Sequence, residues 1–170
     1  FGANQPGITI SFDNNIITSA SSNAQGSWSV ELTIPPSNKA TYFIKASGSD
    51  AEQQIPFSVT PGLFLDKLQA GPGERATVSG GGFAPNETGI ELKLGDTIIK
   101  TGIVANAQGS WGTHFVIPTL PASSYNLTAF GGQTSSGSVQ GRILTLTTRL
   151  SLSASSGSPG TTVILTGQGF

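Results

Sequence analysis

Only a few side chains in the 170-residue sequence have the chemistry that catalysis requires, and His114 is the single histidine among them. One imidazole cannot build a multi-histidine metal site, and a Ser-His-Asp triad needs a nucleophile on a strained turn such as Gly-x-Ser-x-Gly. No such turn occurs in the sequence. His114 is therefore interpreted as a solvated strand residue, and the chain is predicted not to be an enzyme.

The nine acidic residues are dispersed along the chain, so their spacing builds no obvious site. Calcium needs several oxygen ligands from one loop, and only Asp50 and Glu52 lie close together. Two carboxylates can hydrolyse a glycosidic bond, but no insertion is present that would form a cleft around a sugar. The acidic side chains are interpreted as solvated loop charges, and no metal ion or other cofactor is predicted.

Two sequons, Asn86-Glu87-Thr88 and Asn126-Leu127-Thr128, match the pattern for N-glycosylation. Asn86 lies in a predicted loop, and Asn126 lies on the outward face of a predicted strand. Both residues are candidate glycosylation sites, where sugars would shield the chain from proteolysis.

Charge and composition exclude several classes of partner. The formal net charge is -1 and the eight lysines and arginines are scattered, so nucleic acid and anionic membrane surfaces are not predicted partners. No stretch approaches the roughly 20 apolar residues of a membrane span. Cysteine and methionine are absent, which suits an extracellular or cell-surface location. The sequence has neither an initiator Met nor a signal peptide, so a processed or internal fragment is expected.

A repeated hexapeptide dominates the organisation of the chain. Asn-Ala-Gln-Gly-Ser-Trp occupies 23–28 and recurs at 106–111, 83 residues later, which chance does not explain. Three further pairs of segments match: Ile8–Phe12 with Ile90–Leu94, Tyr42–Ala46 with Tyr125–Ala129, and 63–83 with 150–170. The last pair is 87 residues apart. Each unit therefore has nearly the length of an immunoglobulin-type sandwich.

Apolar residues alternate along the segment that follows each hexapeptide. The residues that share one face are Trp28, Val30, Leu32 and Ile34, then Trp111, Phe115 and Ile117. A period of two predicts a strand with one buried face, so both tryptophans are expected in the core and not on a sugar-stacking platform. Tyr42 and Tyr125 are expected to form tyrosine corners, in which the hydroxyl binds nearby backbone.

These patterns predict an all-β fold of tandem immunoglobulin-like β-sandwiches, with about seven strands each. Strands of the second unit are expected near 63–69, 75–80, 89–94, 97–101, 110–117, 124–130 and 143–148. No apolar run has helical spacing and caps, so helices are expected to be scarce.

Three motifs resemble a known group of proteins. They are Gly-Phe-Ala-Pro-Asn-Glu-Thr (82–88), the Asn-Ala-Gln-Gly-Ser-Trp turn and the Tyr-x-Leu-x-Ala strand. Together they resemble the tandem Ig-like repeats, IPT/TIG-like and related, of bacterial and archaeal cell-surface proteins. The resemblance covers the whole chain and implies a fold, not an activity.

The two ends of the chain divide one further unit between them. Residues 63–149 are predicted to be a complete repeat, 1–62 a repeat without its first two strands, and 150–170 the first two strands of the next repeat. An isolated hairpin is marginal in water, and a sandwich without two strands exposes its core. The hairpin is therefore expected to complete 1–62 of a neighbouring copy. The donated side chains would be Leu150, Leu152, Val163, Leu165 and Phe170.

Other arrangements and functions stay open. The chain can instead hold two repeats of a longer covalent array. Under both arrangements, near-identical modules suit a structural extracellular protein that forms a stalk or filament, with other copies of itself or adjacent repeats as head-to-tail partners. The alternative is an adhesin or carbohydrate-binding surface module with surface glycans as partners. A third hypothesis makes the repeats passive linkers beside a catalytic domain elsewhere in the polypeptide.

Overall fold

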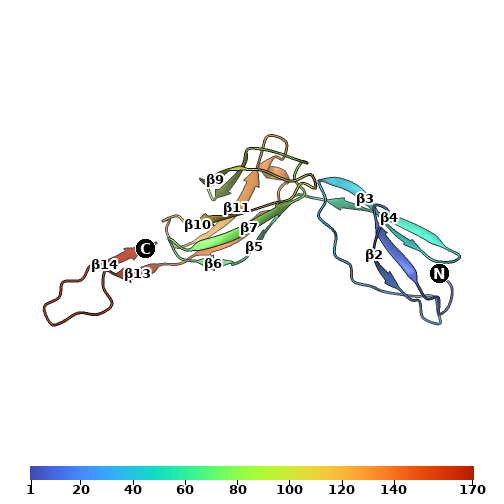
Figure 1. Cartoon of the computed structure of the whole chain (residues 1–170), viewed down its shortest axis with the longest axis horizontal. Coiled ribbons are helices and arrows are strands. Elements are labelled where there is room, and N and C mark those ends of the chain that lie inside the picture. Colours follow the sequence, from blue (N-terminus) through green and yellow to red (C-terminus); the bar gives the residue numbers. More distant parts are fainter.

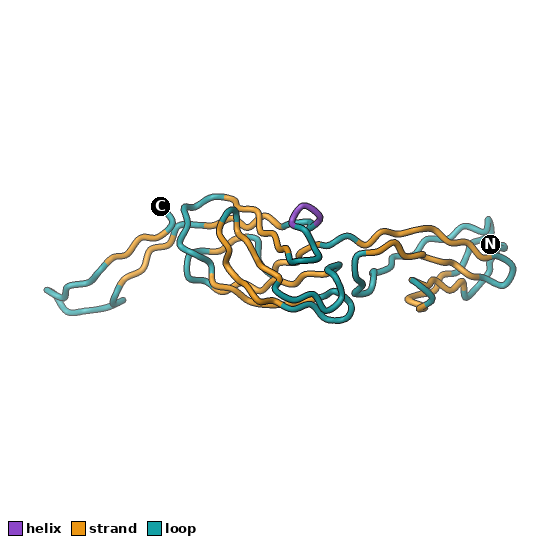
Figure 2. The backbone as a smooth tube through the Cα atoms, turned by 90° about the horizontal axis from the view of Figure 1, so that it is seen from above, coloured by secondary structure: helices purple, strands orange, loops and turns teal.

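The computed structural model describes residues 1–170. The chain is elongated and consists of three consecutive parts (Figure 1). We call them the open unit (1–61), the closed unit (62–148) and the tail hairpin (149–170). The tail hairpin projects from the closed unit on the side away from the open unit (Figure 2). The only helical element is a 3-10 turn, η1 (Ser136–Ser138). The prediction of an all-β chain is confirmed.

The open unit contains a single antiparallel sheet. Its strands are β1 (Ile8–Phe12), β2 (Asn15–Ala20), β3 (Ala40–Ser47) and β4 (Glu52–Val59), in the order β2-β1-β3-β4. Alternate residues of β1 are buried, because successive side chains of a strand point to opposite faces. The unit's small core lies on that one face of the sheet.

The closed unit has two facing sheets that enclose the main core. One sheet has the order β10-β7-β5, formed by β5 (Gly62–Leu65), β7 (Arg75–Gly81) and β10 (Trp111–Val116). The other sheet has the order β6-β12-β11-β8-β9. Its strands are β6 (Gln69–Ala70), β8 (Ile90–Leu94), β9 (Thr97–Ile103), β11 (Ser124–Phe130) and β12 (Arg142–Leu146). Eighteen buried residues form one continuous cluster between the two sheets.

The strand predicted over 63–69 is wrong in one respect, because the chain changes sheets in the middle of it. β5 pairs with β7, whereas β6 pairs in parallel with β12. At the crossing, Asp66 accepts a hydrogen bond from the backbone N–H of Thr77 at 2.9 Å, and Leu68 is exposed. The apolar pattern does not reveal which sheet each half joins. The other strands predicted for this unit agree with the structure to within two residues at each end.

The repeated hexapeptide forms the same turn in both units. The Asn23 Oδ1 accepts hydrogen bonds from the N–H groups of Gln25 and Ser27 at 2.8 and 3.0 Å. The Asn106 Oδ1 does the same in the closed unit, with distances of 3.0 and 2.9 Å. An asparagine side chain that binds backbone donors two and four residues ahead holds the turn closed, which explains why this residue recurs.

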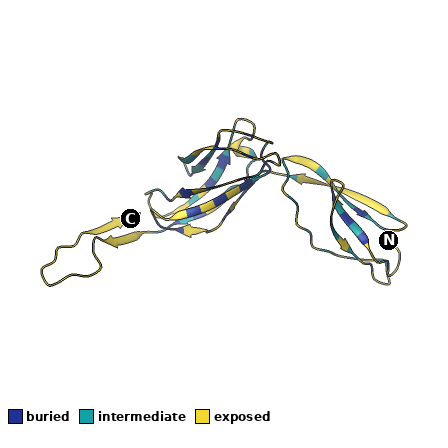
Figure 3. Ribbon diagram, viewed as in Figure 1, coloured by how far each residue is buried: buried dark blue, intermediate teal, exposed yellow.

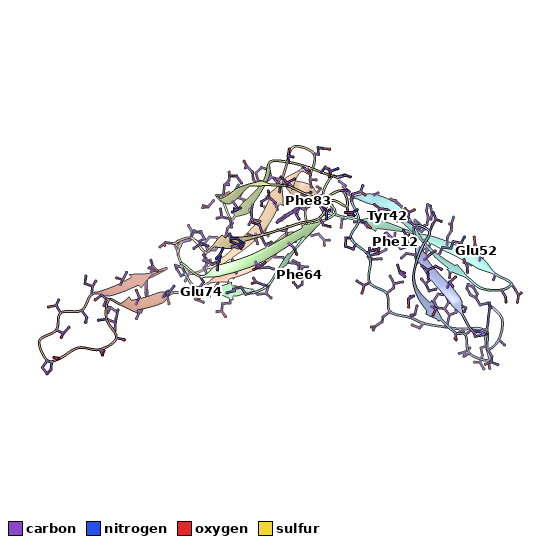
Figure 4. The ribbon with its side chains drawn as sticks, viewed as in Figure 1. Phe12, Tyr42, Glu52, Phe64, Glu74 and Phe83 are labelled. Carbon is purple, nitrogen blue, oxygen red and sulfur yellow. The ribbon has the colours of Figure 1, made fainter.

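The two tyrosine corners are confirmed. The Tyr42 hydroxyl donates to the backbone carbonyl of Asn38 at 3.1 Å, and the Tyr125 hydroxyl donates to that of Pro121 at 3.0 Å. In the open unit, the Tyr42 ring also packs on Phe12, with 4.7 Å between the ring centroids (Figure 4). Each corner fixes the chain that enters the third strand of its sheet.

Candidate functional site: an open groove and an unpaired hairpin

The open and closed units contain the same four-stranded arrangement. The order β2-β1-β3-β4 of the open unit corresponds to β9-β8-β11-β12 of the closed unit. The pairs also correspond, since Phe12 lies opposite Ile44 in the open unit and Leu94 lies opposite Leu127 in the closed unit. The units therefore differ in what covers the sheet and not in the sheet itself.

In the closed unit, β5, β7 and β10 cover the sheet. In the open unit only residues 28–34 lie over it, and they are not a strand, contrary to the sequence prediction. Their side chains still alternate between half-buried and exposed, as in an extended chain. Residues 28–34 form no ladder because the open unit has no strand equivalent to β7, the strand with which β10 pairs in the closed unit.

The missing cover leaves an apolar groove of about 240 Å³ on the open unit. Its lining includes Phe1, Ile10, Trp28, Val30, Leu32 and Ile44. Phe57 on β4 is 37% exposed, whereas Leu144, its counterpart on β12, is fully buried. Trp28 packs against the small core but stays half-buried, whereas Trp111 is buried as predicted. The groove lies where β5 and β7 would sit in a complete unit.

The tail hairpin has the same pairing as β5 and β7 of the closed unit. β13 (Arg149–Leu152) and β14 (Leu165–Gln168) are antiparallel, with Leu150 opposite Gly167 and Leu152 opposite Leu165. In the closed unit β5 pairs with β7 in the same way: Leu63 lies opposite Gly80 and Leu65 opposite Val78. All four positions are displaced by 87 residues, so the hairpin repeats the β5–β7 register without a slip.

The apolar side chains of the tail hairpin have no cover. Leu150, Leu152 and Leu165 are 62%, 55% and 63% exposed, whereas Leu63, Leu65 and Val78 are buried. Val163 and Phe170 are exposed as well. Figure 3 shows the hairpin strands exposed along their length, in contrast with the alternating pattern on β7. The structure thus presents the five predicted donor residues to solvent, and none of them touches the groove of its own chain.

A glycine lies opposite the tryptophan of the closed unit. Trp111 pairs with Gly80, and a Cβ placed on Gly80 would overlap the indole ring. Gly167 is the counterpart of Gly80 in the tail hairpin, where the atoms nearest to the position of a Cβ belong to Phe170 and Leu150. Glycine is needed at this position because no larger residue leaves room for the ring.

The junction between units has the same local geometry twice. Gly82 has a φ of 78°, and a Cβ placed on it would lie 2.9 Å from the carbonyl oxygen of Thr60. Gly169, 87 residues later, has a φ of 74° and lies against the carbonyl of Thr147, which is 87 residues after Thr60. The tail hairpin therefore leaves the closed unit as β5 and β7 leave the open unit.

Glu87 is a buried carboxylate, so the prediction that it is a solvated loop charge is wrong. Its Oε1 accepts the backbone N–H groups of Gln133 and Thr134 at 2.7 and 2.8 Å, and its Oε2 accepts the Thr134 hydroxyl at 2.6 Å. Burial raises the pKa of Glu87, but these bonds and one from Ala84 outweigh it, so the pKa lies below its usual range. In the open unit Gln5 fills the corresponding place, and its Oε1 accepts the N–H of Gly2 at 3.1 Å.

The remaining candidate residues lie apart from the groove. Asn86 is exposed in a loop with a φ of 55°, and Asn126 is exposed on β11. His114 is exposed on β10 and lines a shallow cavity of about 510 Å³ with Arg75 and Lys100. These three basic residues come from separate strands, so the spacing in the sequence does not reveal that they lie together. No carboxylate is among the residues that line this cavity.

The chain has neither a cluster of metal-ligating side chains nor a membrane-spanning helix. No three His, Asp or Glu side chains cluster closely enough to hold a metal ion. None of the helical structure in the chain has the length and apolar character to cross a bilayer.

No protein-family model and no curated protein sequence matches the chain. Among solved structures, the Bacteroides ovatus mixed-linkage glucan utilization locus protein SGBP-B, in complex with a mixed-linkage heptasaccharide, is similar to 85% of the chain, with a TM-score of 0.44 and 16% identity. Gamma-CGTase from alkalophilic Bacillus clarkii is similar to 89% of the chain, with a TM-score of 0.40 and 12% identity. The chain spans 39% and 23% of the lengths of these proteins. At these scores the likeness carries no information on function.

Proposed function

We propose that the chain is a structural, non-enzymatic segment of an extracellular stalk or filament, built from immunoglobulin-like repeats joined head to tail. One observation carries the proposal: the open unit lacks the two strands that the tail hairpin of the same chain holds unpaired, in the same register. The open unit, which contains the groove, and the tail hairpin lie at opposite ends of the elongated chain (Figure 1). A head-to-tail contact between complementary surfaces builds a filament when the rotation between copies does not close a ring.

The energetics of the exposed surfaces support this proposal. Full burial of a leucine side chain stabilises a protein by about 1.5–3 kcal/mol, and the tail hairpin exposes Leu150, Leu152 and Leu165. The unpaired edges of the hairpin add free backbone donors and acceptors. A neighbour that covers both features lowers the free energy of each partner.

The repeated junction supports a regular assembly. Gly82 and Gly169 have the same left-handed backbone and lie against matching carbonyl groups. If this backbone conformation recurs at each junction, successive units meet at the same angle, which gives a regular assembly. The exposed sequons and the absence of cysteine and methionine support an extracellular setting.

Electron microscopy of the native material tests the function. A stalk or fibre with an axial repeat of two small domains is expected. Compact, solitary particles would contradict the proposal, whether the repeats are joined covalently or by exchange of the hairpin.

A second candidate function, a glycan-binding surface module, is favoured by one observation. Trp28 lies half-buried in an apolar groove, where an aromatic ring can offer a flat surface to a sugar. A glycan array probed with the chain and with its Trp28→Ala variant separates the two functions. Binding that disappears in the variant would favour the glycan module, and the absence of any signal would favour the structural function.

A further inference from the structure

We propose that the tail hairpin of one copy fills the groove of a second copy in one register, in which Gly167 lies under the indole ring of Trp28. The inference rests on the proposed function and adds to it the partner, the register and the residue that selects it. The partner is a second copy of this chain, because the hairpin and the groove both occur in it and lie at its opposite ends.

The register follows from the closed unit. There β10 pairs with β7, so that Trp111 lies opposite Gly80, Thr113 opposite Val78 and Phe115 opposite Ala76. Transferred to the corresponding residues, the pairing places Trp28 opposite Gly167, Val30 opposite Leu165 and Leu32 opposite Val163. Residues 28–34 would then gain the ladder that they lack, and Leu165 and Val163 would enter the groove.

Gly167 decides the register because it is the one residue of the hairpin strand that leaves room for the indole. A slip by one residue would bring Thr166 or Gln168 under Trp28 and turn Leu165 to the solvent. A slip by two toward the loop would bring Leu165 itself under the ring. In the closed unit, the space over Gly80 is filled by the ring of Trp111.

The loop of the hairpin would provide a third contact. In the closed unit, β6 adds a short parallel strand to β12, with Leu146 opposite Ala70. The counterparts are Val59 on β4 and Gly157 in the hairpin loop, neither of which is in such a ladder now. The second copy would therefore cover the exposed edge of β4 as well as the groove. It would contact the sheet of the open unit at one face and at one edge.

Phe170 is left out of the buried set, although the sequence analysis included it among the donors. Its counterpart in the closed unit, Phe83, packs edge-on against Trp111 with 5.4 Å between ring centroids. In the open unit Phe1 already holds this place, 5.8 Å from Trp28 and at a similar angle. A second phenylalanine has no room there, and Phe170 must also move off Gly167 before Trp28 can lie on it.

Sedimentation velocity of the purified 170-residue chain and its Gly167→Val variant tests the inference. The wild-type chain is expected to associate as its concentration rises. Gly167→Val should raise the concentration needed for association at least roughly tenfold, because a side chain under Trp28 overpacks the contact. The matched control is Thr166→Val, on the outward face, which should associate like the wild type, as should Phe170→Ala. A wild-type chain that stays monomeric, or equal losses in Gly167→Val and Thr166→Val, would overturn the inference.

Disulfide trapping reads the register directly, because the chain has no cysteine of its own. Ser29 and Thr166 correspond to Gly112 and Ser79, which lie opposite each other in the closed unit. The double variant Ser29→Cys with Thr166→Cys should form a ladder of covalent oligomers with oxidised glutathione. The control pair, Ser29→Cys with Ile164→Cys, is displaced by two residues and should form at least roughly tenfold less. Equal or reversed yields would contradict the proposed register. The proposed function would still be supported in that case if the native material forms fibres.

Discussion

The open and closed units contain the same four-stranded sheet order, yet they differ in the completeness of their cores. Both contain the four-stranded sheet, the asparagine turn and the tyrosine corner. Only the closed unit has a second full sheet, and its core cluster has 18 buried residues against three in the open unit. The comparison teaches that local signals form strands and turns, whereas a buried core depends on a second layer from elsewhere in the chain or from a partner.

The largest effect is expected when the missing layer is supplied within one chain. A permuted protein with residues 149–169 placed before 1–148 joins the hairpin to the open unit and omits the surplus Phe170. The open unit should become a complete sandwich, and association should be lost, because each of the buried leucines adds about 1.5–3 kcal/mol. Sedimentation velocity and hydrogen exchange of residues 28–34 measure both effects.

The control for the permuted protein carries Leu150→Asp and Leu165→Asp, which put charges on the buried face of the hairpin. Its residues 28–34 should exchange as fast as in the natural order. Fast exchange in the permuted protein without these charges would show that the hairpin does not fit the open unit.

The next largest effect on stability is expected from replacing Trp111 or Trp28, the equivalent tryptophans of the two units. Trp111→Ala should lower the free energy of unfolding of the closed unit by about 3–5 kcal/mol, because it leaves a cavity among fully buried neighbours. Trp28→Ala should cost the isolated chain much less, since Trp28 is half-exposed in the groove. Urea unfolding followed by hydrogen exchange in each unit measures the two losses. Equal losses would mean that the open unit is already as well packed as the closed one.

The stability of the closed unit is expected to depend on pH through Glu87, which lies in this unit. Its pKa is lowered in the folded chain, so its stabilising effect is present above the ordinary value of 4.5 and is lost as the pH falls through the lower folded value. Glu87→Gln should remove this pH dependence and cost the closed unit about 1–3 kcal/mol, because the bonds from the Thr134 and Gln133 backbone weaken. Thermal unfolding from pH 7 down to about pH 3 measures it. The exposed Glu31→Gln should change neither quantity.

The smallest effect is expected at the tyrosine corners, where the two units agree. Tyr42→Phe and Tyr125→Phe each remove one hydroxyl and should each cost about 0.5–1.5 kcal/mol. Chemical unfolding of the single variants and the double variant checks whether the losses add, as expected for distant sites. A loss in only one unit would mean that the corners are not equivalent.

Much of the fold could be predicted because its signals are local. The alternation of apolar residues located nearly every strand of the closed unit, and the hexapeptide and the tyrosines located a turn and a corner. Three predictions were wrong for non-local reasons. The chain changes sheets at Asp66, and residues 28–34 do not pair because their neighbour strand is absent. The burial of Glu87 was missed because three of its four hydrogen-bond donors, on Gln133 and Thr134, lie more than 40 residues away along the chain.

The amino-acid sequence by itself determined the all-β fold, the asparagine turns and the tyrosine corners, since strand period and turn chemistry are properties of neighbouring residues. Only the tertiary structure decided that the hairpin keeps the β5–β7 register, that Trp111 packs on Gly80, and that the open unit and the hairpin lie at opposite ends of the chain. These features depend on which distant backbone segments meet, and pairing between distant segments is set by packing in three dimensions.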